Sequence, residues 1–128
     1  MKAGDTYRAT SPLPGIDSNR HLWIILSDPV QYPNEVLAVF MTSYKPRMDK
    51  TCILEVGDHP FITHKTTIAY GATIVWTHAE ILQALADGAI QMREPVSDAV
   101  LRKVRELASY SPKLILSHQK IASKQGFN

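Results

Sequence analysis

The chain has 128 residues, is 45% hydrophobic and 20% charged, and carries a net charge of +2, a composition that predicts one globular domain and excludes a disordered chain. Cys52 is the only cysteine, which excludes an intrachain disulfide and a cysteine metal cage. Charge is unevenly spread: residues 1–99 carry 8 Lys/Arg against 11 Asp/Glu, whereas residues 100–128 carry 6 against 1. A basic C-terminal end is typical either of a solvated helix face or of a surface for an anionic partner.

The N-terminal stretch "MKAGDTYRATSPLPG" is polar and rich in Pro and Gly, unlike the apolar core of a secretory signal. No apolar run approaches the roughly 18 residues that a membrane helix needs. With a single cysteine, these features predict a cytoplasmic protein with no membrane partner.

The first two thirds of the chain predict β-strands. The run "HLWIILS" (21–27) is continuously apolar between turn residues, which favours a strand buried on both faces. Gly71 interrupts a β-branched and aromatic stretch and indicates a bulge or bend. The predicted strands are 5–10, 21–27, 35–43, 50–56 and 65–76.

Helical periodicity replaces the strand pattern from residue 77 onward. Thr77 and Glu80 have capping-box spacing, and Gly88 stands where a helix C-cap belongs. The predicted helices are 77–88, 97–111 and 113–124. Short strands followed by helices, with no helix between the early strands, predict an α+β fold: a small antiparallel barrel or sandwich with helices at one end.

Four segments, in this order, resemble the PemK/MazF family of bacterial toxin ribonucleases. They are "GDTY" (4–7), "RHLWIILSDP" (20–29), "LAVFMTS" (37–43) and "TTIAYGATIVW" (66–76). They take the places of the family's opening Gly-Asp pair, its His-Arg-Pro strand, the strand ending in a Thr/Ser step, and the late strand before the terminal helix.

The resemblance covers most of residues 4–107 and implies a small antiparallel SH3-like β-barrel with C-terminal helices. We expect a single domain over residues 1–128, with 112–128 as a basic C-terminal extension. The resemblance further implies a homodimer, a cognate antitoxin protein as partner, and sequence-selective cleavage of single-stranded RNA without metal or other cofactor. This sequence departs from the family at three places, one of which is a longer segment after Gly88 than compact family members have. The catalytic arginine of the His-Arg-Pro step falls on His21, one residue after Arg20, and Ala69-Tyr70 or Tyr70-Gly71 replaces the late Asp-Gln.

Metal-independent RNA cleavage needs a base for the 2′-hydroxyl, a cation for the phosphorane and an acid for the 5′-oxygen. His21 is the expected general acid or base, with Arg20 on the phosphate and Thr42 bonded to phosphate or substrate. These three are the predicted catalytic residues. The predicted RNA-binding residues are Ser43, His64, Lys65, Lys45 and Arg47.

Alternatives stay open at this point. A barrel of the same ancestry that lacks catalysis would bind nucleic acid or a protein instead. Asp58, His59 and His64 are residue types that bind metal ions, so a metal site in this loop is a further alternative, although Pro60 redirects the chain between the histidines. Several aromatic residues in or near loops are candidates for stacking on unpaired bases: Tyr7, Tyr32, Tyr44, Phe61 and Tyr70.

Overall fold

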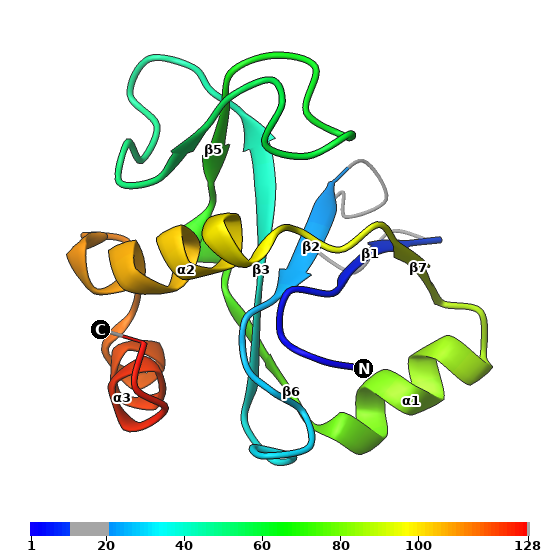
Figure 1. Ribbon diagram of the computed structural model, residues 1–128. Coiled ribbons are helices and arrows are strands. Elements are labelled where there is room, and N and C mark those ends of the chain that lie inside the picture. The colour runs from blue at the N-terminus through cyan, green and yellow to red at the C-terminus, as the bar shows by residue number, and fades with distance from the viewer. Residues whose placement is uncertain (11–20, 128) are drawn as a thin grey trace.

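In the computed structural model, which describes residues 1–10 and 21–127, two antiparallel strands form the centre of one sheet (Figure 1). They are β2 (Leu22–Ile25) and β3 (Val36–Ser43), and Trp23 lies opposite Phe40 in their register. All four β2 residues are buried. The prediction of a strand buried on both faces is therefore confirmed.

The described part of the sheet has seven strands, and every pairing is antiparallel, as predicted. The order is β4-β5-β3-β2-β1-β7, and β6 pairs with the first half of β3 while β5 pairs with its second half. The remaining strands are β1 (Thr6–Ala9), β4 (Ile53–Leu54), β5 (Thr66–Ile68), β6 (Ile74–Trp76) and β7 (Ile90–Arg93). The α+β class is confirmed, but within the described residues the sheet does not close into a barrel, because the path ends at β4 and β7.

Alternate side chains of the central strands enter two separate hydrophobic clusters. Ile24 and Val39 belong to the cluster beneath α2 (Asp98–Leu107) and α3 (Leu116–Lys124). Trp23 and Ala38 belong to the opposite cluster, which α1 (His78–Ala86) covers. Figure 1 shows α1 on the opposite side of the molecule from α3. No helix in the described residues is long and apolar enough to cross a bilayer.

Side-chain caps begin α1 and α2 near the expected positions. Thr77 accepts a hydrogen bond from the Glu80 amide and the Glu80 carboxylate accepts one from the Thr77 amide, so the predicted capping box is present. Ser97 caps α2 through the Val100 amide. Gly88 adopts a φ of +73°, a left-handed conformation that ends α1 at low steric cost.

Further features differ from the sequence prediction, among them the expected strand 50–56, which is reduced to the two residues of β4. The expected strand 65–76 is divided into β5 and β6 by the 3₁₀ turn η2 (Tyr70–Ala72), because β5 and β6 pair with different halves of β3. Strand β7 was not predicted. Its sequence, Ile-Gln-Met-Arg, alternates apolar and polar residues over only four positions, which is too short a signal to predict a strand, and three of the four residues are exposed.

The described part of the C-terminal extension, residues 112–127, packs against the core beneath α2. Leu114, Ala122 and Phe127 are buried in the same cluster as the central strands. Gly126, with a φ of +75°, turns the chain so that the Phe127 amide donates to the Ala122 carbonyl oxygen at 3.0 Å. The extension thus contributes apolar side chains to the core as well as basic charge to the surface.

Replacing Phe127 with Ala should lower the free energy of unfolding by about 3 kcal/mol, because it removes a buried ring and leaves a cavity. Lys124→Ala is the control, since Lys124 forms an exposed ion pair with Glu35 worth about 0.5 kcal/mol or less. Urea denaturation measures both variants. Equal, small losses would show that 112–128 does not contribute to the core.

Asp49 joins the loop after β3 to the chain beyond α2. Its carboxylate accepts hydrogen bonds from the Thr51 amide at 2.9 Å and from the Ser111 hydroxyl at 2.5 Å. Partial burial raises the pKa of the Asp49 carboxyl, but the bonds from Ser111 and Thr51, with the nearby Lys113 charge, outweigh it and hold the pKa below its usual value.

Since the folded-state pKa lies below the unfolded one, the ionised Asp49 stabilises the fold above the unfolded pKa of about 3.9. That contribution is lost as pH falls through the folded pKa. The difference in unfolding free energy between wild type and Asp49→Asn should therefore shrink below about pH 4. Thermal denaturation from pH 7 to pH 2.5 tests this, with Glu55→Gln, an exposed carboxyl, as control. A difference that stays constant with pH would contradict it.

Candidate functional site

A hollow of about 750 Å³ lies at the end of β3. It combines residues from the start of β2, the end of β3 and the loops that precede β4 and β5. Its lining residues are His21, Met41, Thr42, Ser43, Lys45, Met48, Pro60, Phe61, Thr63, His64 and Thr66. Five of the predicted site residues lie here together: His21, Thr42, Ser43, Lys45 and His64.

Strand pairing brings Ser43 and His64 together. Ser43 is the last residue of β3 and lies opposite Thr66 of β5, two residues beyond His64. The Ser43 hydroxyl and the His64 Nε2 atom are 2.6 Å apart, and the Thr63 hydroxyl lies 3.1 Å from Nδ1. Which nitrogen carries the proton depends on the tautomer. The exposed His64 ring is thus held at both nitrogens, in a geometry suited to proton transfer.

An aromatic column that extends from the core supports His21. The His21 ring stacks on Phe40 with centroids 4.3 Å apart, and Phe40 contacts Trp23 edge to face at 5.0 Å. Trp23 in turn stacks on Tyr7 at 6.0 Å. The imidazole of His21 therefore stands at the rim of the hollow on a rigid base, because three of the four rings belong to the sheet's own packing.

The remaining predicted residues lie in different places. Lys65 and Arg47 are exposed but are not among the residues that line the hollow. The Lys65 ammonium lies over the Tyr44 ring, 4.8 Å from its centroid. Arg47 has a φ of 78° in the loop after β3. Arg20, the predicted phosphate ligand, lies outside the described residues.

The histidine loop does not assemble a metal site among the described residues. The buried His59 ring accepts a hydrogen bond from the Phe61 amide at Nδ1, and its Nε2 lies 2.6 Å from the Glu94 carbonyl oxygen, to which it donates. The Asp58 carboxylate accepts a hydrogen bond from the Glu55 amide at 2.8 Å. Because these atoms already have protein partners, Asp58 and His59 hold the loop in shape, and only His64 faces the hollow.

The aromatic candidates divide in the same way. Tyr7 and Tyr70 are buried, so the expectation that they stack on bases is wrong. Tyr7 accepts a hydrogen bond from the Trp76 indole, and Tyr70 donates one to the Val104 carbonyl oxygen. Burial raises the pKa of both phenols. Phe61 is 38% exposed and lines the hollow, which leaves it available for stacking.

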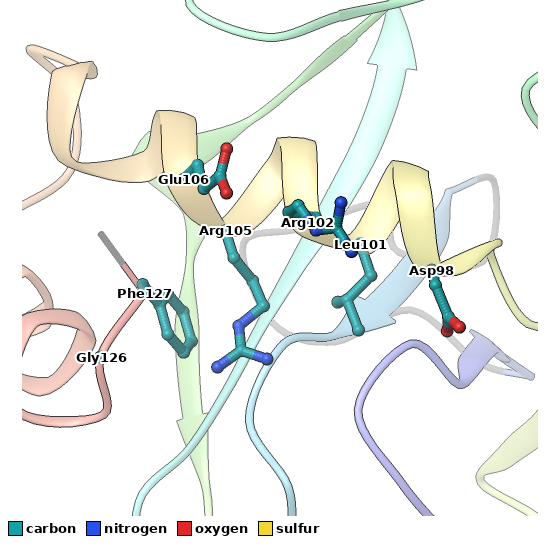
Figure 2. Close-up of a pocket in the computed structure, with 7 residues that line it drawn as sticks. All are labelled: Asp98, Leu101, Arg102, Arg105, Glu106, Gly126 and Phe127. Carbon is teal, nitrogen blue, oxygen red and sulfur yellow. The ribbon is translucent and has the colours of Figure 1, made fainter.

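A second hollow, of about 380 Å³, lies between α2 and the C-terminal segment (Figure 2). Arg105 extends from α2 to Phe127, with its guanidinium carbon 4.5 Å from the ring centroid. Asp98 and Glu106 also line this hollow and offset Arg102 and Arg105. Close by, the Lys103 ammonium donates to the Ile53 carbonyl oxygen at 2.6 Å. The basic face of α2 thus has structural contacts of its own, and no histidine lines its hollow.

Comparisons of the chain with protein-family models, with curated proteins and with solved structures found no match. The function is therefore inferred from the geometry of the hollow and from the resemblance to PemK/MazF toxins.

Sequence reasoning missed several residues of the hollow, above all Thr63, Pro60 and Met48. Thr63 contacts the His64 ring, and only its position next to that histidine marked it in the sequence. Met48 comes from a loop whose path no local pattern specifies.

Replacing the buried His59 with Ala should lower the free energy of unfolding by about 2 kcal/mol or more, because the Phe61 amide and Glu94 carbonyl lose their partner. His64→Ala, an exposed histidine of the same loop, should change it by about 0.5 kcal/mol. Chemical denaturation of the two variants provides the comparison. The structural assignment of His59 fails if His64→Ala proves the more destabilising.

Proposed function

We propose that the protein is a metal-independent endoribonuclease that cleaves single-stranded RNA at the hollow beside Ser43. One observation carries the proposal: two imidazoles, His21 and His64, line the same hollow, together with Lys45 and the Thr42 and Ser43 hydroxyls. Imidazole is the side chain best suited to give and take protons near neutral pH. Lysine provides a positive charge for phosphate.

The proposed reaction is an internal transesterification. One histidine removes the proton from the 2′-hydroxyl, whose oxygen attacks the adjacent phosphorus. The phosphorus–5′-oxygen bond breaks, and the other histidine protonates the departing oxygen. The products are a 2′,3′-cyclic phosphate and a free 5′-hydroxyl, and no outside reactant is needed.

His64 is the proposed base. Thr63 and Ser43 fix its ring from both sides, which holds one nitrogen ready for the substrate once RNA displaces one of the hydroxyls. His21 is the proposed acid, with its ring orientation set by Phe40. Lys45 stabilises the charge that develops on the phosphate, and Thr42 hydrogen-bonds a phosphate oxygen. Arg20 adjoins His21 in the chain and is proposed as a second phosphate ligand.

A specific observation also favours a second function, nucleic-acid or protein binding without cleavage. Both ring nitrogens of His64 already have hydroxyl partners. If those bonds persist with ligand present, His64 shapes the surface and transfers no proton.

The PemK/MazF resemblance extends the proposal beyond the hollow. It supports an SH3-like architecture built around the sheet, a homodimer, an antitoxin protein as the inhibiting partner, and action in the cytoplasm. Sedimentation analysis tests the homodimer through a mass of twice 14.3 kDa.

His64→Gln should reduce the rate of cleavage of a single-stranded RNA by at least about 100-fold, the typical share of one general acid–base group. The same loss is expected for His21→Ala. Wild-type cleavage should continue in excess chelator, produce the cyclic phosphate and spare an all-deoxy strand. Gel electrophoresis of end-labelled oligonucleotides measures each result.

The matched control is His118→Gln on α3, a histidine that does not line the hollow, and it should keep the wild-type rate. Cleavage that a chelator abolishes would overturn the metal-independent mechanism. RNA binding with no cleavage by the wild type would favour the second function.

A further inference from the structure

A third hollow, of about 270 Å³, adjoins the proposed cleavage site. Pro60 and Phe61 line both hollows, so they form a shared ridge between them. The other lining residues are Arg8, Leu22, His59, Arg93 and Glu94. A strand of RNA that leaves the larger hollow across this ridge enters the smaller one directly.

Sheet register places the two arginines side by side. Thr6 of β1 lies opposite Arg93 of β7, and Arg8 lies opposite Gln91. Since residues two apart in a strand share a face, Arg8 and Arg93 project on the same face as a diagonal cross-strand pair. On its other side β1 pairs with β2, where Thr6 lies opposite Ile24. Two residues further along, the same register places Arg8 beside Leu22 on that face. The pair thus borders the hollow from β1 and from β7, the strand at the edge of the described sheet.

The chemistry of this hollow fits one nucleotide and its phosphate. The guanidinium carbon of Arg8 lies over the Phe61 ring, 5.6 Å from its centroid, so the cation and the ring already form a pair on which a base would stack from outside. Unpaired bases stack on both kinds of group, and guanidinium groups bind phosphate through paired donors. Glu94 also lines the hollow, so two arginines and one glutamate leave an excess of one positive charge, which matches the charge of a single phosphodiester.

The buried His59 fixes the wall of this hollow. Its ring accepts a hydrogen bond from the Phe61 amide and donates one to the Glu94 carbonyl oxygen. The same carbonyl oxygen accepts a hydrogen bond from the Thr6 hydroxyl at 2.7 Å. The ridge is therefore held to the β1–β7 edge by hydrogen bonds. A binding surface that is fixed in advance loses less conformational entropy when a ligand binds.

We propose that Arg8, Arg93 and Phe61 form a subsite for a nucleotide flanking the cleaved bond, an assignment that rests on the proposed ribonuclease function. Binding there extends the RNA segment that the protein contacts by one nucleotide and positions the cleaved bond beside His64. The salt dependence of binding arises in part at this subsite, because two of the cations that contact the strand stand here.

The test uses the whole protein and RNA oligonucleotides of two to five nucleotides, made uncleavable by a 2′-deoxy sugar at the scissile position. For the wild type, affinity measured by fluorescence anisotropy should rise at least about tenfold when the strand becomes long enough to cross the ridge. Arg8→Gln and Arg93→Gln should each remove this rise and leave dinucleotide affinity unchanged. Each should also reduce the slope of log K against log salt by about 0.7.

Phe61→Leu should lose the affinity rise but keep the salt slope, since it removes a stacking face and no charge. Arg102→Gln on α2, an exposed arginine of the hollow in Figure 2, is the charge-matched control and should behave as wild type.

The outcomes separate this inference from the proposed function. An affinity rise that depends on Arg93, without cleavage of ordinary RNA, would support the subsite and overturn the ribonuclease. Cleavage with an affinity unaffected by Arg8→Gln and Arg93→Gln would overturn the subsite alone. Failure of the wild type to bind any oligonucleotide would overturn both, as would binding of an acidic peptide here in preference to RNA.

Discussion

The structure depends on the burial of β2 and β3 on both faces. Because alternate side chains of these strands enter opposite clusters, neither face can be exposed without loss of a core. Helices α2 and α3 must cover one side and α1 the other. At roughly 25 cal/mol per Å² of apolar surface, this burial is the main favourable term in folding. It also sets where polar chemistry can be located, since no ionisable group is tolerated between the layers without partners.

Polar groups consequently gather where the central strands leave the core. Along β3 the pattern changes from buried Val39 to the half-buried Thr42 and Ser43 within four residues. His21 precedes the first buried residue of β2. Antiparallel pairing brings the end of one strand beside the start of the other, so Thr42 and His21 meet at one rim. The same pairing that builds the core therefore assembles the hollow.

The features that the sequence could predict are those that depend on residues close together in the chain. The capping box at Thr77 and the apolar run of β2 are local, and both predictions were confirmed. The contact between Ser43 and His64 spans 21 residues and depends on β5 pairing with the second half of β3. No pattern within either segment specifies that choice. Strand β7 was missed for a related reason. Its residues Ile-Gln-Met-Arg alternate apolar and polar over only four positions, and its place in the sheet comes from pairing with the distant β1.

The loop from His59 to His64 shows why residue type alone does not identify a site. Both histidines have two ring partners, yet one is buried and bonded to backbone, while the other is exposed and bonded to hydroxyls. Backbone partners cannot leave without exposing unpaired groups, so His59 is fixed in one tautomer and serves the fold. Hydroxyls rotate, and each both donates and accepts, so His64 can change its protonation state without breaking the loop. His59 also fixes the adjacent Pro60–Phe61 ridge, which lines the hollow together with His64. The structural histidine therefore holds in place part of the surface that surrounds the proposed catalytic one.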